Sequence, residues 1–295
     1  MDLDMRWFFT QKGGNAAVDY EDAFCVPQGG NSLRPYPVNS APSRVQVFDS
    51  TSSVRLAIAD GASESSFAGT WAKLLVKSFC RPPSTTPTGT DSGDSRRDAL
   101  KDLVFNRLDK KRDVWKKCYG TRELPWYAEQ KRDMGAFAAF LGLELLPSEP
   151  RQAAGSWNAV AIGDTCLFHF RKDKLLIAFP IEAPEDFSLS PLLLTTRQPA
   201  TSQSEHARQC SGEWQPGDEF VLLTDAAACW LLKSRRLPDA DPLACLRDLS
   251  TQQDFEAWVT FQRLDKVDGQ PRLRNDDVTF ISCRVLETHG QAGQR

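Results

Sequence analysis

The residues of this sequence that could do chemistry are aspartates placed where apolar segments begin or end. The apolar segment at residues 54–59 runs directly into Asp60 and Gly61, and the segment at 220–224 runs into Asp225. Two further aspartates occupy the same kind of position: Asp164 and Asp276. Rigid strand backbone can hold such side chains in place. Carboxylates that converge repel one another, so a cluster of them requires a cation.

The residue types indicate which cation and which reaction. Ligation by oxygen atoms alone favours Mg²⁺ or Mn²⁺ over zinc, and three histidines do not suggest a zinc set. Gly61 lacks a Cβ, so its carbonyl could approach a metal or a phosphate closely. A pair of such ions about 4 Å apart can deprotonate a bridging water and hold it in line with a phosphoryl group. Spacing along the sequence does not prove that these aspartates converge, but it makes their convergence around metal ions testable.

Strands dominate the elements that must position these aspartates. Residues 45–48 and 54–59 are β-rich runs separated by a hairpin signal. We predict further strands at 137–146, 157–162, 168–171, 175–179, 220–223 and 278–285. Helical periodicity predicts helices over 65–79 and 98–115, and a capping-box pattern at 250–253 precedes a third. The expected class is α+β, with antiparallel sheets and helices on their outer faces.

Length and composition are consistent with one domain over residues 1–286, of the 295 in the chain. Residues 81–97, rich in Pro, Ser, Thr and Gly, are expected to form a mobile loop, and the polar residues 195–215 a flap. Residues 287–295 are expected to be a disordered tail.

Charge and cysteine usage narrow the functional classes. A net charge of −3 does not indicate binding to nucleic acid or anionic lipid, which is typical of chains with an excess of positive charge. No apolar run is long enough to cross a membrane or resemble a signal peptide. The eight cysteines form no CxxC pair and lie mostly in apolar segments, which predicts buried free thiols and a cytoplasmic location.

Six short motifs, in order over about residues 12–286, resemble those of the protein phosphatase 2C family of metal-dependent (PPM-type) Ser/Thr phosphatases, in a divergent bacterial form. Each motif alone is weak, and their order and spacing carry the resemblance. The six segments are Tyr20-Glu21-Asp22-Ala23, Ala59-Asp60-Gly61-Ala62, Gly135-Ala136-Phe137-Ala138, Ala161-Ile162-Gly163-Asp164-Thr165, the run from Pro216-Gly217-Asp218 to Asp225, and Asp276-Asp277-Val278-Thr279.

The resemblance implies a central β-sandwich of two antiparallel sheets flanked by helix pairs (α-β-β-α). It also implies roles for the acidic residues. Asp60 would bridge two Mg²⁺ or Mn²⁺ ions, Gly61 would lend its carbonyl, and Asp225 and Asp276 would complete one ion. Either Glu21 or Asp22 would reach the second ion, and Asp164 with Asp225 would hold a weaker third. Asp60, Asp225 and Asp276 form the catalytic set that this implies.

The sequence departs from the family pattern around the substrate. Ser63 and Glu64 replace the glycine pair of the family's DGxGG motif, and Ala226 replaces the glycine that follows Asp225. The arginine expected just upstream of the acidic motif to bind phosphate is absent, and Lys12 or Arg6 could replace it, with surface charge as the other interpretation. Lys12 is therefore the residue that we predict to bind the substrate.

Two functional hypotheses follow. The first is a phosphoprotein phosphatase that hydrolyses phosphoserine or phosphothreonine with metal-activated water, acting as a monomer, with a Ser/Thr kinase as a further partner. The second is a catalytically weak binding or regulatory module that keeps the fold and acts with a kinase or phosphoprotein. Retention of the acidic residues favours the first, and the altered loop and missing arginine motivate the second.

Overall fold

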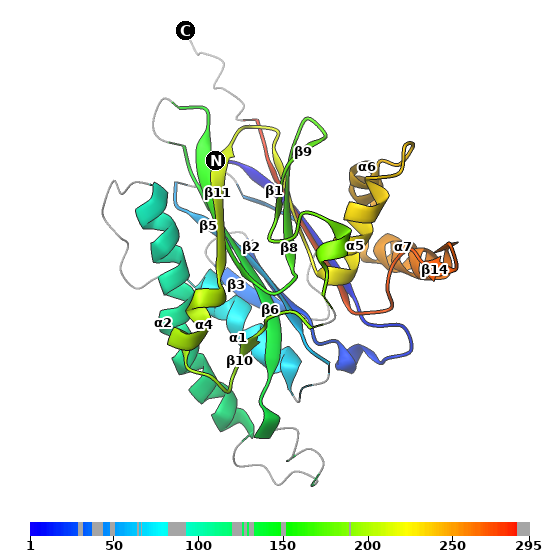
Figure 1. Cartoon of the computed structure of the whole chain (residues 1–295). Helices are drawn as coiled ribbons and strands as arrows, with labels where there is room; N and C mark the ends of the chain where they lie inside the picture. The colour runs from blue at the N-terminus through cyan, green and yellow to red at the C-terminus, as the bar shows by residue number, and fades with distance from the viewer. Residues whose placement is uncertain are drawn as a thin grey trace.

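The computed structural model describes residues 1–28, 32–36, 44–47, 51–63, 65, 67–81, 93–119, 126, 129, 133–148, 152–188 and 190–287. Within them, two antiparallel sheets pack face to face, with helices on both outer faces (Figure 1). The predicted α+β sandwich is therefore confirmed.

The first sheet has the strand order β4-β1-β15-β12-β8-β9. Its central strand β15 pairs with β1 from Leu3↔Val285 to Thr10↔Val278, and with β12 on the other side. The strands are β1 (Leu3–Thr10), β4 (Arg44–Val47), β8 (Cys166–Arg171), β9 (Lys174–Phe179), β12 (Glu219–Leu223) and β15 (Val278–Val285).

The second sheet has the order β11-β7-β6-β5-β2-β3, and the short strand β10 also pairs with β6. A separate hairpin, β13 (Lys266–Val267) and β14 (Gln270–Pro271), lies outside both sheets. The strands of the second sheet are β2 (Ala23–Gln28), β3 (Ser32–Tyr36), β5 (Val54–Gly61), β6 (Phe137–Leu146), β7 (Gly155–Ile162), β10 (Leu194–Thr195) and β11 (Arg208–Trp214).

Helices cover the two outer faces. Helices α1 (Ala68–Cys80) and α2 (Gly93–Tyr119) lie on the second sheet, and α5 (Asp225–Ser234), α6 (Pro242–Asp248) and α7 (Gln252–Leu264) lie on the first (Figure 1). The short elements are α4 (Ala200–Gln203), η1 (Ala17–Asp19), η2 (Pro184–Asp186) and η3 (Ser204–His206). None of the described helices is long and apolar enough to cross a membrane.

Three apolar cores hold the four layers together. One lies between the sheets and includes Trp157, Phe220 and Ile281. The others lie under the two helical layers, where Trp71 of α1 and Phe255 of α7 are buried against the sheets. Because successive strand side chains point to opposite faces, each central strand contributes to two cores at once. The cores therefore fix the strand ends that carry the aspartates.

Two of the expected irregular segments contain regular secondary structure. Residues 93–97, expected in a mobile loop, form the first part of α2. Residues 195–215, expected as a flap, include the edge strand β11, which pairs with β7 from Arg208↔Ala161 to Trp214↔Gly155. Its outward side chains are polar, and Trp214 packs inward to anchor it.

The expected loop and tail are only partly covered by the described residues. Residues 82–92 of the expected loop and 288–295 of the expected tail lie outside the described residues. Strand β1 was not predicted, although Leu3, Met5 and Trp7 alternate with charged residues and are buried. All eight cysteines are free, as predicted, but only four are buried: Cys25, Cys80, Cys166 and Cys283.

Candidate active site

Asp60 lies at the end of β5, where Gly61 brings two backbone segments close together. A Cβ at Gly61 would lie 2.7 Å from the carbonyl oxygen of Glu21 and 3.0 Å from the backbone of Ala68. Gly69, in the first turn of α1, packs against Glu21 in the same way, because a Cβ there would lie 3.1 Å from its Cα. These glycines let the acidic motif at Glu21 and Asp22 reach the end of β5.

Asp22 lies directly before β2 and is fully buried. Its Oδ2 accepts a hydrogen bond of 2.6 Å from the hydroxyl of Thr279 on β15, and Thr279 in turn contacts the hydroxyl of Tyr20. The other oxygen, Oδ1, is buried with no hydrogen-bond partner among the described residues. Burial raises the pKa of Asp22 well above its usual range, and the charge of Asp277 raises it further.

Asp225 is the first residue of α5, directly after β12, and it is also buried. Hydrogen bonds between Thr224 and Thr279, of 2.9 and 3.2 Å, join this strand end to β15. The guanidinium of Arg274 contacts Asp225 Oδ2, whereas Oδ1 is buried without a partner in the described part of the chain. Burial raises the pKa of Asp225, and the charge of Arg274 opposes that rise.

Asp164 follows the turn at Gly163, whose φ of +93° suits glycine, after the end of β7. It is buried, and burial together with the charge of Asp225 raises its pKa to about 7. Asp276 is half-buried just before β15, and its Oδ2 lies 3.4 Å from a guanidinium nitrogen of Arg274. Arg274 therefore bridges two of the predicted site residues, Asp225 and Asp276.

The strand ends bring the predicted carboxylates into one electrostatic cluster. The carboxyl of Asp60 is half-buried, and its pKa is raised well above the usual range, first by burial. Four other carboxylates then raise it further, which requires that they lie near it: Asp22, Asp225, Asp164 and Asp276. Several negative charges held together in this way favour either protonation or a bound cation.

Asp277 is a site residue that the sequence interpretation did not assign. Its Oδ1 accepts a 2.7 Å hydrogen bond from the backbone N–H of Lys12, and its Oδ2 accepts one of 2.7 Å from the N–H of Glu21. Asp277 thus ties the end of β1 and the acidic motif to the start of β15. Only its position beside Asp276 in the motif could have indicated this role.

The arginines also differ from the sequence interpretation. Arg6, considered as a phosphate ligand, donates instead to the carbonyls of Arg247 and Leu249, far along β1 from the aspartates. Arg274 was not considered, although it lies two residues before Asp276 in the chain. Its side chain is 49% exposed, so a guanidinium stands at the mouth of the acidic cluster.

The donor set fits a divalent cation in its chemistry. Two buried carboxylate oxygens, Asp22 Oδ1 and Asp225 Oδ1, have no hydrogen-bond partner in the described part of the chain. Such oxygens are costly to bury unless something ligates them. As the side chains stand, no three Asp, Glu, His or Cys side chains among the described residues are close enough together to hold an ion.

Comparison with solved structures defines the class of fold. The four-layer arrangement is that of the phosphatase 2C-type serine/threonine phosphatases. The chain is similar to the Mycobacterium tuberculosis serine/threonine phosphatase PstP/Ppp, with 14% identity, a TM-score of 0.53 and coverage of 97% of this chain and 100% of that one.

Two further structures give the same result. PppA, described as a key regulatory component of T6SS in Pseudomonas aeruginosa, has 14% identity and a TM-score of 0.51, covering 96% of this chain and 97% of its own. The S. agalactiae serine/threonine phosphatase has 12% identity and a TM-score of 0.51, covering 95% and 99%. The sequence itself matches no protein-family profile and no curated protein.

Proposed function

We propose that this chain is a metal-dependent phosphoprotein phosphatase acting on phosphoserine or phosphothreonine. The observation that carries the proposal is the cluster of carboxylates from five strand ends, whose charges raise the pKa of Asp60. The fold supports it, since one solved structure of the catalytic domain of the phosphatase PstP, with a TM-score of 0.51, is described as a complex with two manganese ions.

The proposed ligands are those given by the six motifs. Asp60, the carbonyl of Gly61, Asp225 and Asp276 would hold the main Mg²⁺ or Mn²⁺ pair, together with Glu21 or Asp22. Asp164 and Asp225 would hold a weaker third ion. Cations there supply Lewis-acid activation of water and neutralise charge on the reacting phosphoryl group.

The chain's own residues orient the site and its substrate. Asp277 and Thr279 fix the backbone and carboxylate of the acidic motif through the hydrogen bonds described above. Arg274 is half-exposed at the cluster, and the planar fork of a guanidinium matches phosphate oxygens. We propose that Arg274 binds the substrate phosphate in place of the missing upstream arginine. Lys12, whose backbone is held by Asp277, remains the second candidate.

Phosphopeptide hydrolysis tests the activity directly. Release of phosphate from a phosphoserine peptide should require Mn²⁺ and stop with EDTA. Asp60→Asn and Asp225→Asn should each reduce the rate by more than about a hundredfold, since even partners of metal ligands typically cost 10–100-fold. Asp173→Asn, at an exposed aspartate in the β8–β9 turn, is the matched control and should leave the rate unchanged. Equal rates with EDTA, or full activity in both site variants, would refute the proposal.

The alternative function is the catalytically weak binding module. The contact of Arg274 with Asp225 and Asp276 favours it, because a built-in guanidinium supplies part of the positive charge that a metal would bring. Calorimetric titration of Mn²⁺ into the native chain and into Arg274→Gln separates the two. Binding by the native chain with turnover rules out the module. Binding by Arg274→Gln alone would support it.

The wider biology follows from the same proposal. A phosphorylated protein is the expected partner, and a Ser/Thr kinase acting on the same substrate is a further prediction. A monomeric state and a cytoplasmic location also stay predictions. Size-exclusion chromatography with light scattering measures the first, and fractionation of cells that express the chain measures the second.

A further inference from the structure

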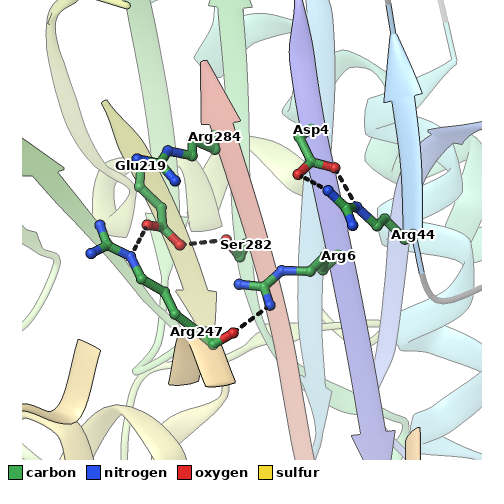
Figure 2. Close-up of a pocket in the computed structure, with 7 residues that line it drawn as sticks. All are labelled: Asp4, Arg6, Arg44, Glu219, Arg247, Ser282 and Arg284. Carbon is green, nitrogen blue, oxygen red and sulfur yellow. Dashed lines mark hydrogen bonds and ion pairs between the residues drawn. The ribbon is translucent and has the colours of Figure 1, made fainter. Parts of the chain in front are cut away.

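A charged cavity lies in the first sheet, away from the acidic cluster. It has a volume of about 220 Å³. Its lining comes from four strands and helix α6, and Figure 2 shows these side chains around one shared space. The lining residues are Asp4, Arg6, Arg44, Glu219, Arg247, Ser282 and Arg284.

Strand register explains why these residues meet. Arg6 pairs with Ser282 across β1 and β15, and Arg284 pairs with Glu219 across β15 and β12. Arg44 on β4 lies opposite Arg6. Ser282 is six residues along β15 from Asp276, which at about 3.3 Å per residue places the cavity on the order of 20 Å from the acidic cluster. The cavity is thus separate from the proposed active site.

The lining carries more positive than negative charge. It has four guanidinium groups and two carboxylates, an excess of two positive charges. Both carboxylates are already paired: Asp4 accepts two hydrogen bonds of 2.7 and 2.8 Å from Arg44, and Glu219 accepts one of 2.7 Å from Arg247. Arg247 also contacts Asp173, which lies outside the lining and is 66% exposed, so water screens that charge.

Two guanidinium groups have no carboxylate partner among the described residues. Arg6 donates from one nitrogen to the carbonyls of Arg247 and Leu249, at 2.8 and 3.0 Å, which fixes its position without neutralising its charge. Arg284 makes no ion pair or side-chain hydrogen bond in the described part of the chain and is exposed. Burial lowers the pKa of Arg6, consistent with a guanidinium that lacks a full counter-charge.

We propose that this cavity binds a small phosphate anion, as free phosphate or pyrophosphate. Guanidinium groups recognise phosphate oxygens through paired N–H donors, and a phosphate group carries about two negative charges at neutral pH, matching the excess of two on the lining. Arg6 is held in place before the ligand arrives, which lowers the entropy lost on binding. Arg284 is free to turn toward the anion.

Calorimetric titration of inorganic phosphate and of pyrophosphate into the full chain tests the proposal. EDTA is kept in the buffer to remove divalent metal, and the titration is repeated with Arg274→Gln, which removes the guanidinium proposed to bind substrate phosphate. Binding that persists in this variant does not depend on the proposed enzymatic activity. We expect a single site for at least one of the two anions, weakening as salt is raised. Arg284→Ala should weaken that binding about tenfold or more, the value of one charge-assisted hydrogen bond.

Two variants act as controls. Arg236→Ala removes the same charge from an exposed ion pair with Glu185, away from the cavity, and should leave the affinity unchanged. Asp60→Asn should also leave it unchanged. No binding of either anion at millimolar concentration would overturn the proposal. Equal losses in Arg284→Ala and Arg236→Ala would also overturn it, because they would show attraction by net charge alone.

Discussion

The pKa values of buried carboxylates shift in opposite directions at the two ends of the first sheet. At the end where β12 stops and β15 starts, Asp22, Asp225 and Asp164 are buried, and the pKa of each is raised. At the other end, Asp218 is equally buried, yet its pKa is lowered. Burial alone would raise that pKa, but hydrogen bonds from Arg171, the backbone N–H of Gln215 and His169 more than offset it.

The contrast separates buried charges that stabilise the folded state from buried charges that destabilise it. A carboxylate with its own guanidinium and N–H donors stabilises the folded state, as Asp218 does. At the acidic end, Arg274 contacts Asp225 and Asp276, yet burial still leaves the pKa of Asp225 raised, and such a cluster opposes folding at neutral pH. A fold keeps such a cluster only when something else favours it, and for the acidic end we propose that this is a bound cation.

The largest effect expected from this contrast is on the pH dependence of the free energy of unfolding. The pKa of Asp164 rises from 3.8 to about 7 on folding, so between those values the folded state holds a proton that the unfolded state has lost. Unfolding free energy should therefore fall as pH rises from about 4 to about 7. At about 1.4 kcal/mol per pKa unit, this one group contributes on the order of 4 kcal/mol.

Thermal unfolding of the metal-free chain at pH 5 and pH 8 measures this change. Asp22, Asp60 and Asp225 act in the same direction because their pKa values are also raised. His169 acts in the opposite direction, since burial lowers its pKa. Asp164→Asn should flatten the profile. A Tm that rises between pH 5 and pH 8 would contradict the prediction.

Removing the paired carboxylate at the opposite end should be nearly as damaging. Asp218→Ala leaves the buried ring of His169 and the guanidinium of Arg171 without the oxygens that they contact at 2.8 Å. Breaking one side of a buried ion pair typically costs about 3–5 kcal/mol. Urea unfolding measures the loss. Asp173→Ala, which removes an exposed carboxylate near the same end, should cost no more than about 1 kcal/mol.

Strand-end positions drew attention to Asp60, Asp164, Asp225 and Asp276, because an aspartate beside an apolar run can be recognised in the sequence alone. Their roles as metal ligands stay predictions. Asp277 and Arg274 were missed for a different reason. Their roles depend on which backbone N–H or carboxylate lies opposite them, and that is set by contacts between residues as far apart as Lys12 and Asp277.

The fold shows the same limit. The long apolar strands of both sheets were predicted from composition, whereas β1 and β11 were missed. In β1, charged residues alternate with buried ones, and in β11 only Trp214 is buried. The arginine-lined cavity could not be predicted at all. Its residues come together only through the register of β1, β12 and β15, which no local pattern in the sequence encodes.

A smaller effect is expected from crowding the acidic end without changing its charge. Gly61→Ala would place a methyl group 2.7 Å from the carbonyl oxygen of Glu21, in backbone that cannot give way easily. Overpacking of this kind costs about 1–3 kcal/mol. It should also weaken Mn²⁺ binding, since Glu21 and Asp22 would be displaced. Ala62→Ser, at the next and half-exposed position, is the control, and equal Tm values for the two variants would refute the packing argument.

The smallest effect on stability is expected from Arg44, at the rim of the arginine-lined cavity. Its substitution should affect phosphate binding without affecting folding. Arg44 is 60% exposed, so its ion pair with Asp4 should contribute no more than about 1 kcal/mol. Arg44→Ala should therefore leave the urea midpoint almost unchanged. The same variant should still weaken phosphate binding in calorimetry, because it removes one of the four guanidinium groups of the lining. Unchanged stability with unchanged phosphate affinity would mean that Arg44 only solvates this end of the sheet. A large loss of stability would instead show that the charges there hold the fold together, as Asp218 does.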